Sequence, residues 1–289
     1  MATLLTAASA QTVYDRFFDE YYFPFSPTTA TSVGIHKYDG KLEDYSKAGV
    51  AKRVAALKKF ESEFARLPES PDRDLVLNTI RAGLLELETV RGWERNPDNY
   101  SSGITNSAFV IMSRTFASPQ ARLKSLTARE RLMPKVLAEA RSNLKNPPRI
   151  YTEVAIEQMP GNISFFEHDV PLAFKTVTDA QLLADFRAAN SAVIASLKEY
   201  EEWMKKDLLP RSQGDFRLGP STYAKKLLYE EMVDIPLDRL LAIGYDDLRA
   251  NQKRFAETAA RIDPNKTPQQ ILLEVEKDHP SGDKLLDAF

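Results

Sequence analysis

The sequence contains no cysteine, which excludes disulfide bonds, thiolate metal sites and cysteine nucleophiles. Histidine is also scarce, with three in 289 residues: His36, His168 and His279. Helical zinc peptidases place two histidines one helical turn apart, with a glutamate beside the first. No such pair occurs here. We therefore expect no metal site in this chain, a cap by His36 on the preceding helix, and structural roles for the other two at a helix end and in a turn.

Long apolar runs and an excess of one charge are missing as well. No segment reaches the roughly 18 continuous apolar residues of a membrane span. Basic residues number 39 and acidic residues 41, and this balance argues against a nucleic-acid binder. Glycine is scarce at 11 residues, and no glycine-rich phosphate loop or Gly-x-Ser-x-Gly elbow is present. The composition, 43% hydrophobic and 28% charged, is that of a globular chain.

The first eleven residues allow two interpretations. Ala8-Ser9-Ala10 has the small-x-small form of a signal-peptidase site, and two leucines precede it. The apolar run is short, however, and no Lys or Arg comes before it. Residues 1–11 are thus either the remnant of an export signal, which implies a periplasmic protein, or a disordered start of a cytoplasmic one.

Apolar residues recur at helical spacing along most of the chain, whereas strand-like alternation is nearly absent. We expect an all-α array of about ten helices with short connectors and at most one short β-hairpin. Residues 12–289 should form a single helical domain, the N-terminal part of a larger protein. The expected helices include 72–93, 104–112, 119–126, 151–158, a long helix after Thr178, 221–232 and 236–262.

Local signals predict where several helices begin or break. Thr178 with Gln181, and Thr267 with Gln270, have the spacing of capping boxes. Pro160-Gly161 is expected to interrupt the helix that precedes it. Aromatic residues from Tyr14 to Phe25 follow helical spacing, and we expect them to form core and not a ligand groove. Adjacent acidic pairs such as Glu201-Glu202 diverge on a helix and are expected to be solvated.

One stretch, GDFRLGPSTYAKKLL, has the pattern of a binding element. Gly214 and Gly219 bracket a short extended segment that leads into a helix N-terminus, with Arg217 before the helix and Tyr223 in its first turn. Helix N-termini favour anionic groups such as a peptide carboxylate. We predict Arg217 and Tyr223 as substrate-binding residues; the alternative is a structural turn whose arginine pairs with a surface acid.

Five strings, taken in order, resemble the N-terminal half of the bacterial proteins grouped as domain of unknown function 885 (DUF885). They are TATSVGIHKYDGKLEDYS, ETVRGWERNPDNY, KNPPRIYTEVAIEQMPG, WMKKDLLPRSQGDFRLGPSTYAKKLL and IDPNKTPQQILLEVEKDHP. The resemblance implies a mostly helical relative of zinc metallopeptidases. It also implies a zinc site, His-Glu followed by Pro-Gly-His, in the C-terminal half. Here Pro160-Gly161 is followed by Asn162, and Pro280 by Ser281, so no metal ligand is carried over.

Three hypotheses follow for the function. The chain is the non-catalytic helical half of a peptidase-like hydrolase, whose groove helps to bind peptide and whose zinc belongs to the full-length protein only. Alternatively, it is a free-standing helical binding or scaffolding protein. The third hypothesis is an enzyme with an unrecognised carboxylate-based site.

The end of the sequence resembles a point inside a longer family pattern, because a new amphipathic turn with Leu285, Leu286 and Phe289 starts there. We expect these residues, and the apolar side of the 236–262 helix, to be exposed. Exposed apolar surface drives association. We therefore expect the chain either to pair with a C-terminal half or to form a homodimer.

Overall fold

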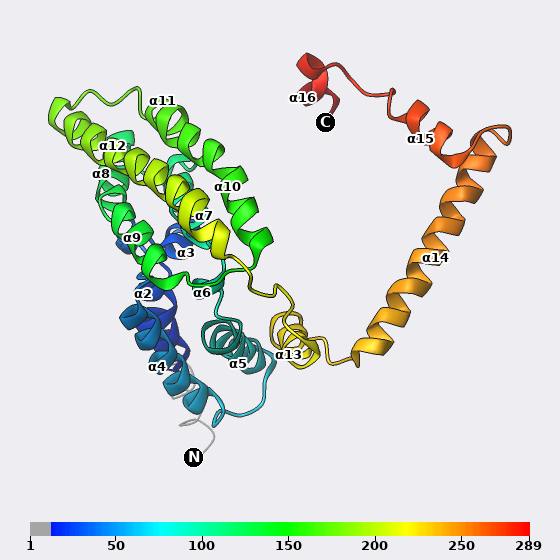
Figure 1. The fold of residues 1–289 in the computed structure, drawn as a ribbon, viewed down its shortest axis with the longest axis horizontal. Coiled ribbons are helices and arrows are strands. Elements are labelled where there is room, and N and C mark those ends of the chain that lie inside the picture. Colours follow the sequence, from blue (N-terminus) through cyan, green and yellow to red (C-terminus); the bar gives the residue numbers. More distant parts are fainter. Residues whose placement is uncertain (1–12) are drawn as a thin grey trace, which may run out of the picture. The chain divides into compact units, whose positions relative to one another are not determined.

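The computed structural model describes residues 13–289, and within these residues the chain is helical and contains no strand (Figure 1). The all-α prediction is confirmed. The chain divides into two compact units, the first ending at Met232 and the second running from Val233 to Phe289. The candidate signal remnant Ala8-Ser9-Ala10 lies outside the described residues.

An aromatic core forms the N-terminal part of the first unit. The π-helix η1 (Phe17–Tyr22) and the short α2 (Phe23–Phe25) bring Phe17 against α4 (Lys47–Phe64). The ring of Phe17 meets those of Phe60 and Phe64 edge-on, with centroids 5.5 and 5.6 Å apart. Leucine and isoleucine side chains of α5 (Pro71–Leu84) complete this cluster. Phe17 and Tyr21 are thus core residues, as their spacing predicts, while Phe18 stays partly exposed.

A second and larger core lies among five long helices. These are α7 (Asp98–Met112), α8 (Pro119–Glu130), α9 (Met133–Asn143), α10 (Arg149–Ser164) and α12 (Ala180–Trp203). The helix α12 packs on α8, α9 and α10 (Figure 1). Its buried residues follow the predicted helical stripe and include Phe186, Ala189, Val193, Leu197 and Tyr200.

Short helices connect these elements. They are α3 (Pro27–Ser32), η2 (His36–Tyr38), η3 (Leu85–Val90), α6 (Gly92–Arg95), η4 (Phe165–Asp169), α11 (Val170–Ala173), η5 (Met204–Leu208) and η6 (Leu209–Arg211). The 12-residue helix α13 (Pro220–Glu231) follows η6 and ends the first unit.

The prediction of a single helix over residues 72–93 is wrong at the C-terminal end of this range. The helix α5 widens into the π-helix η3, and Arg91 then takes a left-handed conformation with φ 55°. The carboxylate of Glu86 accepts a hydrogen bond from the backbone N–H of Gly92 at 3.1 Å. This side-chain bond satisfies a donor that a continuous helix would have paired with a carbonyl, and α6 starts as a separate turn.

The prediction of a break at Pro160 is also wrong, because α10 continues through this proline to Ser164. A proline inside a helix loses one backbone hydrogen bond and crowds the preceding turn. Here Met159 and Ile163, on either side of it, are buried in the larger core. Packing of this face holds the helix together, and the helical run goes on through η4 and α11. The helices α7 and α8 are likewise longer than the expected 104–112 and 119–126.

The predicted capping box at Thr178 does not form. Asp179 is the N-cap of α12, and its carboxylate accepts from the backbone N–H of Leu182 at 3.0 Å. Gln181 instead contacts Asp185. Two neighbouring side chains could both cap this helix, and a carboxylate is favoured at the positive end of the helix dipole.

The segment 216–218, expected to be extended, contains no strand; the nearest backbone pairing is an isolated bridge between Pro148 and Gly214. In the second unit, α14 (Leu237–Ile262) is followed by α15 (Pro268–Val275), η7 (Gly282–Lys284) and α16 (Leu285–Ala288). The capping box at Thr267 and Gln270 forms as predicted, with both reciprocal bonds present.

Candidate functional site

The turn that carries Arg217 is anchored on the connection between α9 and α10. The backbone N–H of Gly214 donates to the carbonyl of Pro147 at 3.0 Å. The backbone N–H of Gln213 donates to Asn146 Oδ1 at 2.8 Å. A Cβ on Gly214 would lie 2.5 Å from the carbonyl oxygen of Asn146, so this close approach requires glycine.

Arg217 itself is exposed and locally paired. Its guanidinium lies 3.4 Å from Asp215 Oδ1 and 5.0 Å from the centroid of the Phe216 ring. The backbone N–H of Arg217 also donates to Asp215, and this bond, more than the charge of Arg217, lowers the pKa of the Asp215 carboxyl. Tyr223 is exposed in the first turn of α13. The described contacts do not join Arg217 to Tyr223, and their substrate-binding role stays a prediction.

The three histidines belong to different segments of the chain. His36 starts η2, where its imidazole stacks on Phe116 with centroids 3.9 Å apart and Nδ1 lies 3.1 Å from Asp39 Oδ2. It therefore does not cap α3. His168 lies within the π-helix η4, and His279 contacts the carbonyl of the following proline. Across residues 13–289 no group of three or more His, Cys, Asp or Glu side chains could hold a metal ion.

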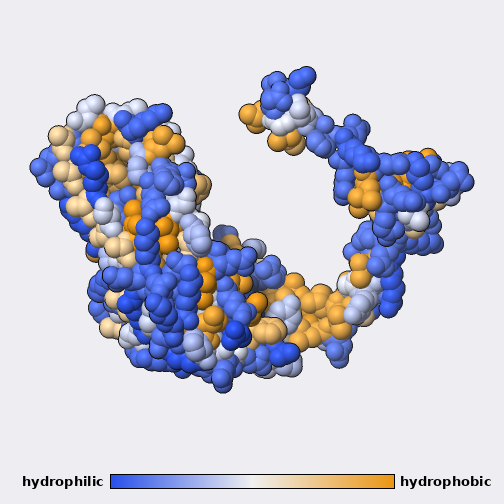
Figure 2. All heavy atoms as spheres, turned by 45° about the horizontal axis from the view of Figure 1, so that its top comes forward, coloured by the Kyte–Doolittle hydropathy of each residue, from blue (hydrophilic) through white to orange (hydrophobic). Residues whose placement is uncertain are grey.

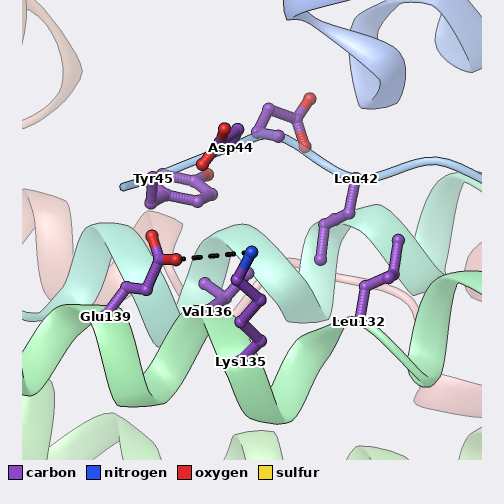
Figure 3. Close-up of a pocket in the computed structure, with 8 residues that line it drawn as sticks. Leu42, Asp44, Tyr45, Leu132, Lys135, Val136 and Glu139 are labelled. Atoms are coloured by element: carbon purple, nitrogen blue, oxygen red, sulfur yellow. Dashed lines mark ion pairs between the residues drawn. The ribbon is translucent and has the colours of Figure 1, made fainter. Parts of the chain in front are cut away.

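A cavity lies between α9 and residues 41–45, a segment outside the helices that we call the strap. It measures about 210 Å³, and we call it the strap pocket (Figure 3). Leu42 and Leu132 point toward each other at one end, and Glu139 and Lys135 lie toward the other. The full lining consists of Leu42, Glu43, Asp44, Tyr45, Leu132, Lys135, Val136 and Glu139.

Three sets of contacts hold the strap in place. Glu43 accepts from both the backbone N–H and the hydroxyl of Thr28, each at 2.9 Å. Asn143 donates to the carbonyl of Tyr45 at 2.8 Å. A Cβ on Gly49 would lie 2.5 Å from the carboxyl carbon of Asp44, so the start of α4 fits against the strap because residue 49 is glycine. The strap wall of the pocket is therefore fixed from both sides.

Charge in the strap pocket is unevenly distributed. Lys135 Nζ lies 3.6 Å from Glu139 Oε1, and Glu139 Oε2 is buried without a hydrogen-bond partner among the described residues. Burial raises the pKa of Tyr45, and the nearby Glu43 carboxylate raises it further. Burial also raises the pKa of Tyr100 to about 12, with a further contribution from Glu139. Both phenols therefore stay neutral at neutral pH.

A buried polar network beside the strap was not predicted from the sequence. Arg129 is fully buried on α8 and donates to the carbonyl of Ser107 at 2.8 Å and to Thr31 Oγ1 at 2.9 Å. Thr31 in turn donates to Asp39 at 2.7 Å. Burial lowers the pKa of Arg129 to about 10, against the opposing charges of Glu43 and Asp39. Helical spacing could have indicated that Arg129 is buried, because Arg122, Leu126 and Arg129 share one buried face of α8.

Glu130, the next residue, is also fully buried. In the part of the chain that the structure describes, neither of its carboxylate oxygens has a hydrogen-bond partner. Burial raises the pKa of Glu130 to about 9. The carboxyl group is therefore protonated at neutral pH. Because it is sealed from solvent, we assign it no contact with substrate.

The helix α14 carries an apolar stripe that its own unit leaves uncovered. Leu241, Leu248, Phe255 and Ile262 recur every seven residues and are 59%, 49%, 44% and 59% exposed. Apolar side chains of the second unit reach the surface in Figure 2. On this helix Ala259 is the one buried residue. Leu285, Leu286 and Phe289 are exposed as well, as expected.

None of the described helices is long and apolar enough to cross a membrane. Among curated proteins, none matches the chain. A solved structure, described as "a putative lipoprotein of unknown function from Shewanella oneidensis", matches with a TM-score of 0.72 and 24% sequence identity. The match covers 88% of this chain and 48% of the neighbour, so the chain spans about half of the neighbour's length.

This likeness shows that the two proteins share a fold. The family model described as "Bacterial protein of unknown function (DUF885)" matches residues 27–289. The matched range includes the strap, the anchored turn at Gly214 and all of α14. The chain belongs to the DUF885 family.

Proposed function

We propose that this chain is the non-catalytic helical part of a zinc-dependent, peptidase-like hydrolase, in which it forms one wall of a peptide-binding cleft. The observation that carries the proposal is the uncovered apolar stripe of α14 in a chain that spans 48% of its structural neighbour. The zinc-site motif that the family resemblance implies is absent from this sequence. The chemistry is therefore assigned to residues outside the chain.

The stripe fits a protein partner in preference to an anionic surface. Four large apolar side chains at a seven-residue spacing form a seam of the kind that packs against another helix. The charged residues of α14 have both signs, with Asp246 and Glu257 beside Arg249 and Lys253. A membrane-surface helix would instead concentrate Lys and Arg on its polar face. We propose that the stripe contacts a further part of a longer protein. That part would correspond to the half of the structural neighbour that this chain does not cover.

In this proposal Arg217 and Tyr223 contact the peptide. The turn before α13 is anchored at Gly214, and the exposed Arg217 offers a cation near the positive end of the helix dipole. A peptide carboxylate would replace Asp215 as the partner of the guanidinium. We also propose that, without the other half, two copies of the chain associate through the α14 stripe as a homodimer.

We also propose that the protein is exported. Two observations support export: the small-x-small site at Ala8-Ser9-Ala10, and the description of the structural neighbour as a lipoprotein. Fusion of residues 1–30 to an alkaline phosphatase reporter that is active only outside the cytoplasm tests it. A fusion that is inactive although it is expressed would contradict export.

The function is tested by expressing the chain alone and extended by the sequence that follows codon 289 in its gene. Both forms are assayed for cleavage of a mixed peptide library, with and without a chelator. We expect no cleavage by the chain alone and chelator-sensitive cleavage by the extended form. A stop codon directly after Phe289, or chelator-insensitive cleavage by the chain alone, would contradict the proposal. The stop codon would favour a free-standing binding protein.

A further inference from the structure

We propose that α13 is a hinged flap, which swings away from α5 and η3 as one unit and closes over them again. The helix lies beside α5 (Figure 1) and belongs to the first unit. It carries Tyr223 and follows Arg217, the two residues predicted to contact substrate. The movement itself does not depend on the proposed function, whereas its role in peptide capture rests on that function.

The closed position of α13 is held by few contacts. None of its 12 residues is buried. The other long helices of the first unit, which are α4, α5, α7, α8, α9, α10 and α12, each bury at least three. Within residues 13–289, no side-chain hydrogen bond or ion pair joins α13 to another element, and its ion pair between Lys226 and Glu230 lies inside the helix. Segments with few buried contacts open locally at a low cost in free energy.

Two cavities reduce the contact between α13 and its neighbours. The larger, of about 350 Å³, lies against α5 and is lined on the other side by Leu228 and Met232. The smaller, of about 180 Å³, is lined by Lys225 and Tyr229 of α13 and by residues of α4, α5 and η3. Side chains that border a cavity have fewer packing partners, so less dispersion attraction holds α13 in place.

Positive φ angles bound α13 at both ends. Gly219, immediately before it, has φ 78° and ψ 157°, a conformation that is open almost exclusively to glycine. Met232, immediately after it, is left-handed with φ 55°, and its backbone N–H donates to the carbonyl of Leu227. A side chain with a Cβ is strained in this conformation. Hinges are residues at the ends of an element that absorb such changes in φ and ψ, and these two residues fit that role.

The turn before Gly219 is fixed, and it therefore defines where the movement begins. Gln213 and Gly214 are bonded to the connection between α9 and α10, and Arg95 of α6 donates to the carbonyl of Asp215. Residues up to 215 thus stay with the larger core while α13 swings. Because Tyr223 moves with the flap, a peptide that contacts both the turn and Tyr223 would hold the flap in one position.

Hydrogen–deuterium exchange of the full chain tests the movement. A helix of this length is marginal in water by itself, so α13 loses its backbone hydrogen bonds when it swings out. We expect the amides of residues 224–231 to exchange together, at least about a hundredfold faster than those in the buried part of α5. Protection equal to that of α5 would overturn the proposal. Exchange at the rate of an unstructured peptide would mean that no closed position exists, and this too would overturn it.

Two variants localise the hinge. Gly219→Ala strains the closed position and should speed exchange in α13 about tenfold, whereas Met232→Gly relieves strain and should slow it several-fold. Matched controls are Gly161→Ala, where nothing lies within 4 Å, and Arg91→Gly, at a left-handed residue outside the flap. Both controls should leave exchange in α13 unchanged. If Gly219→Ala disturbs folding, Met232→Gly decides, because unchanged or faster exchange in that variant would overturn the hinge.

A second measurement tests the role in peptide capture. A mixed library of hexapeptides with free C-terminal carboxylates is added to the chain, and the same library with amidated C-termini is the control. We expect the free acids to slow exchange in α13 at least about threefold and the amides to have less effect, because a carboxylate pairs with Arg217. No response to either library would overturn this role. The cleavage assay of the extended form tests the proposed function separately, so the two failures are distinguishable.

Discussion

Arg129 donates a buried hydrogen bond of 2.9 Å to Thr31, a residue 98 positions earlier in the chain. The same guanidinium binds the carbonyl of Ser107 and faces the carbonyls of Pro27 and Tyr38. One side chain of α8 therefore ties α7 to the N-terminal helices that carry the strap. The contact places a charged residue at a junction between segments that are distant in sequence.

Removal of this guanidinium should destabilise the first unit strongly. We expect Arg129→Met to lower the free energy of unfolding by about 3–5 kcal/mol, because several buried acceptors lose their donor together and Asp39 loses a nearby positive charge. Arg131→Met is the matched control. Arg131 is exposed and pairs with Asp185 at 3.4 Å, so its loss should change stability by less than about 1 kcal/mol. Urea unfolding measures both; equal effects would contradict the role of Arg129.

Glu130 should make stability fall as pH rises. Below its ordinary pKa of 4.5 the carboxyl is protonated in both the folded and unfolded states. Above 4.5 the unfolded chain ionises it, while burial keeps it protonated in the folded state up to about pH 9. Its contribution to stability is thus full at low pH and lost between pH 4.5 and 9, by at most about 1.4 kcal/mol per pH unit.

Glu130→Gln removes this titration. We expect the variant to gain stability relative to the original chain as pH increases from 5 to 8.5, whatever its absolute stability at pH 5. Urea unfolding at several pH values measures the trend. An exposed change, Glu157→Gln, reports the effect of removing one surface charge. Parallel pH curves for the original chain and Glu130→Gln would show that the buried carboxyl does not shape the pH dependence.

Two glycines should respond to alanine in opposite ways. At Gly49 a methyl group would lie 2.5 Å from the carboxyl carbon of Asp44 and 2.7 Å from its carbonyl oxygen, so the strap would have to move. We expect Gly49→Ala to destabilise the chain by about 1–3 kcal/mol. At Gly161, inside α10, nothing lies within 4 Å, and Gly161→Ala should stabilise it by about 0.5–1 kcal/mol. Thermal unfolding compares the two, and a stabilising Gly49→Ala would be the contrary result.

The stripe of α14 should make the chain associate. We expect light scattering to show a mass that rises with concentration, because large apolar side chains leave water on association. Leu248→Glu and Phe255→Glu should each shift the chain toward the monomer without loss of helical circular dichroism. Ala250→Glu, exposed on the opposite face of α14, is the control and should leave the mass unchanged. A monomeric original chain would contradict the prediction.

The isolated chain should hold no stoichiometric zinc. His36 and His279 each contact other groups, and the described residues contain no group of three metal-ligating side chains. Elemental analysis of dialysed protein provides the measurement. One tightly held zinc per chain would mean that His36, His168 and His279 have other roles than those described.

Local sequence predicted the elements better than their ends. The capping box at Thr267 and Gln270 formed because both partners lie within one turn and compete with nothing else. At Thr178 and Asp179 two caps were available, and the carboxylate made the bond. At Pro160 the local rule predicted a break, but the burial of Met159 and Ile163 outweighed one lost hydrogen bond.

Among the candidate sites, too, local sequence indicated some residues and missed others. Arg217 and Tyr223 stood out because glycine and proline surround them in sequence. The strap pocket joins residues 42–45 to residues 132–139, and no local pattern links the two segments. The same holds for Arg129 and Glu130, since adjacent charged residues on a helix are ordinarily solvated and only the neighbouring helices bury both of them here.

The sequence by itself determined the helical class, the aromatic core near the N-terminus, the stripe of α12 and the family, because these depend on the periodicity and order of neighbouring residues. The tertiary structure alone decided which charges are buried, where Pro160 is tolerated and which distant segments line one pocket. Burial and desolvation depend on what packs over a side chain, and those neighbours come from elsewhere in the chain.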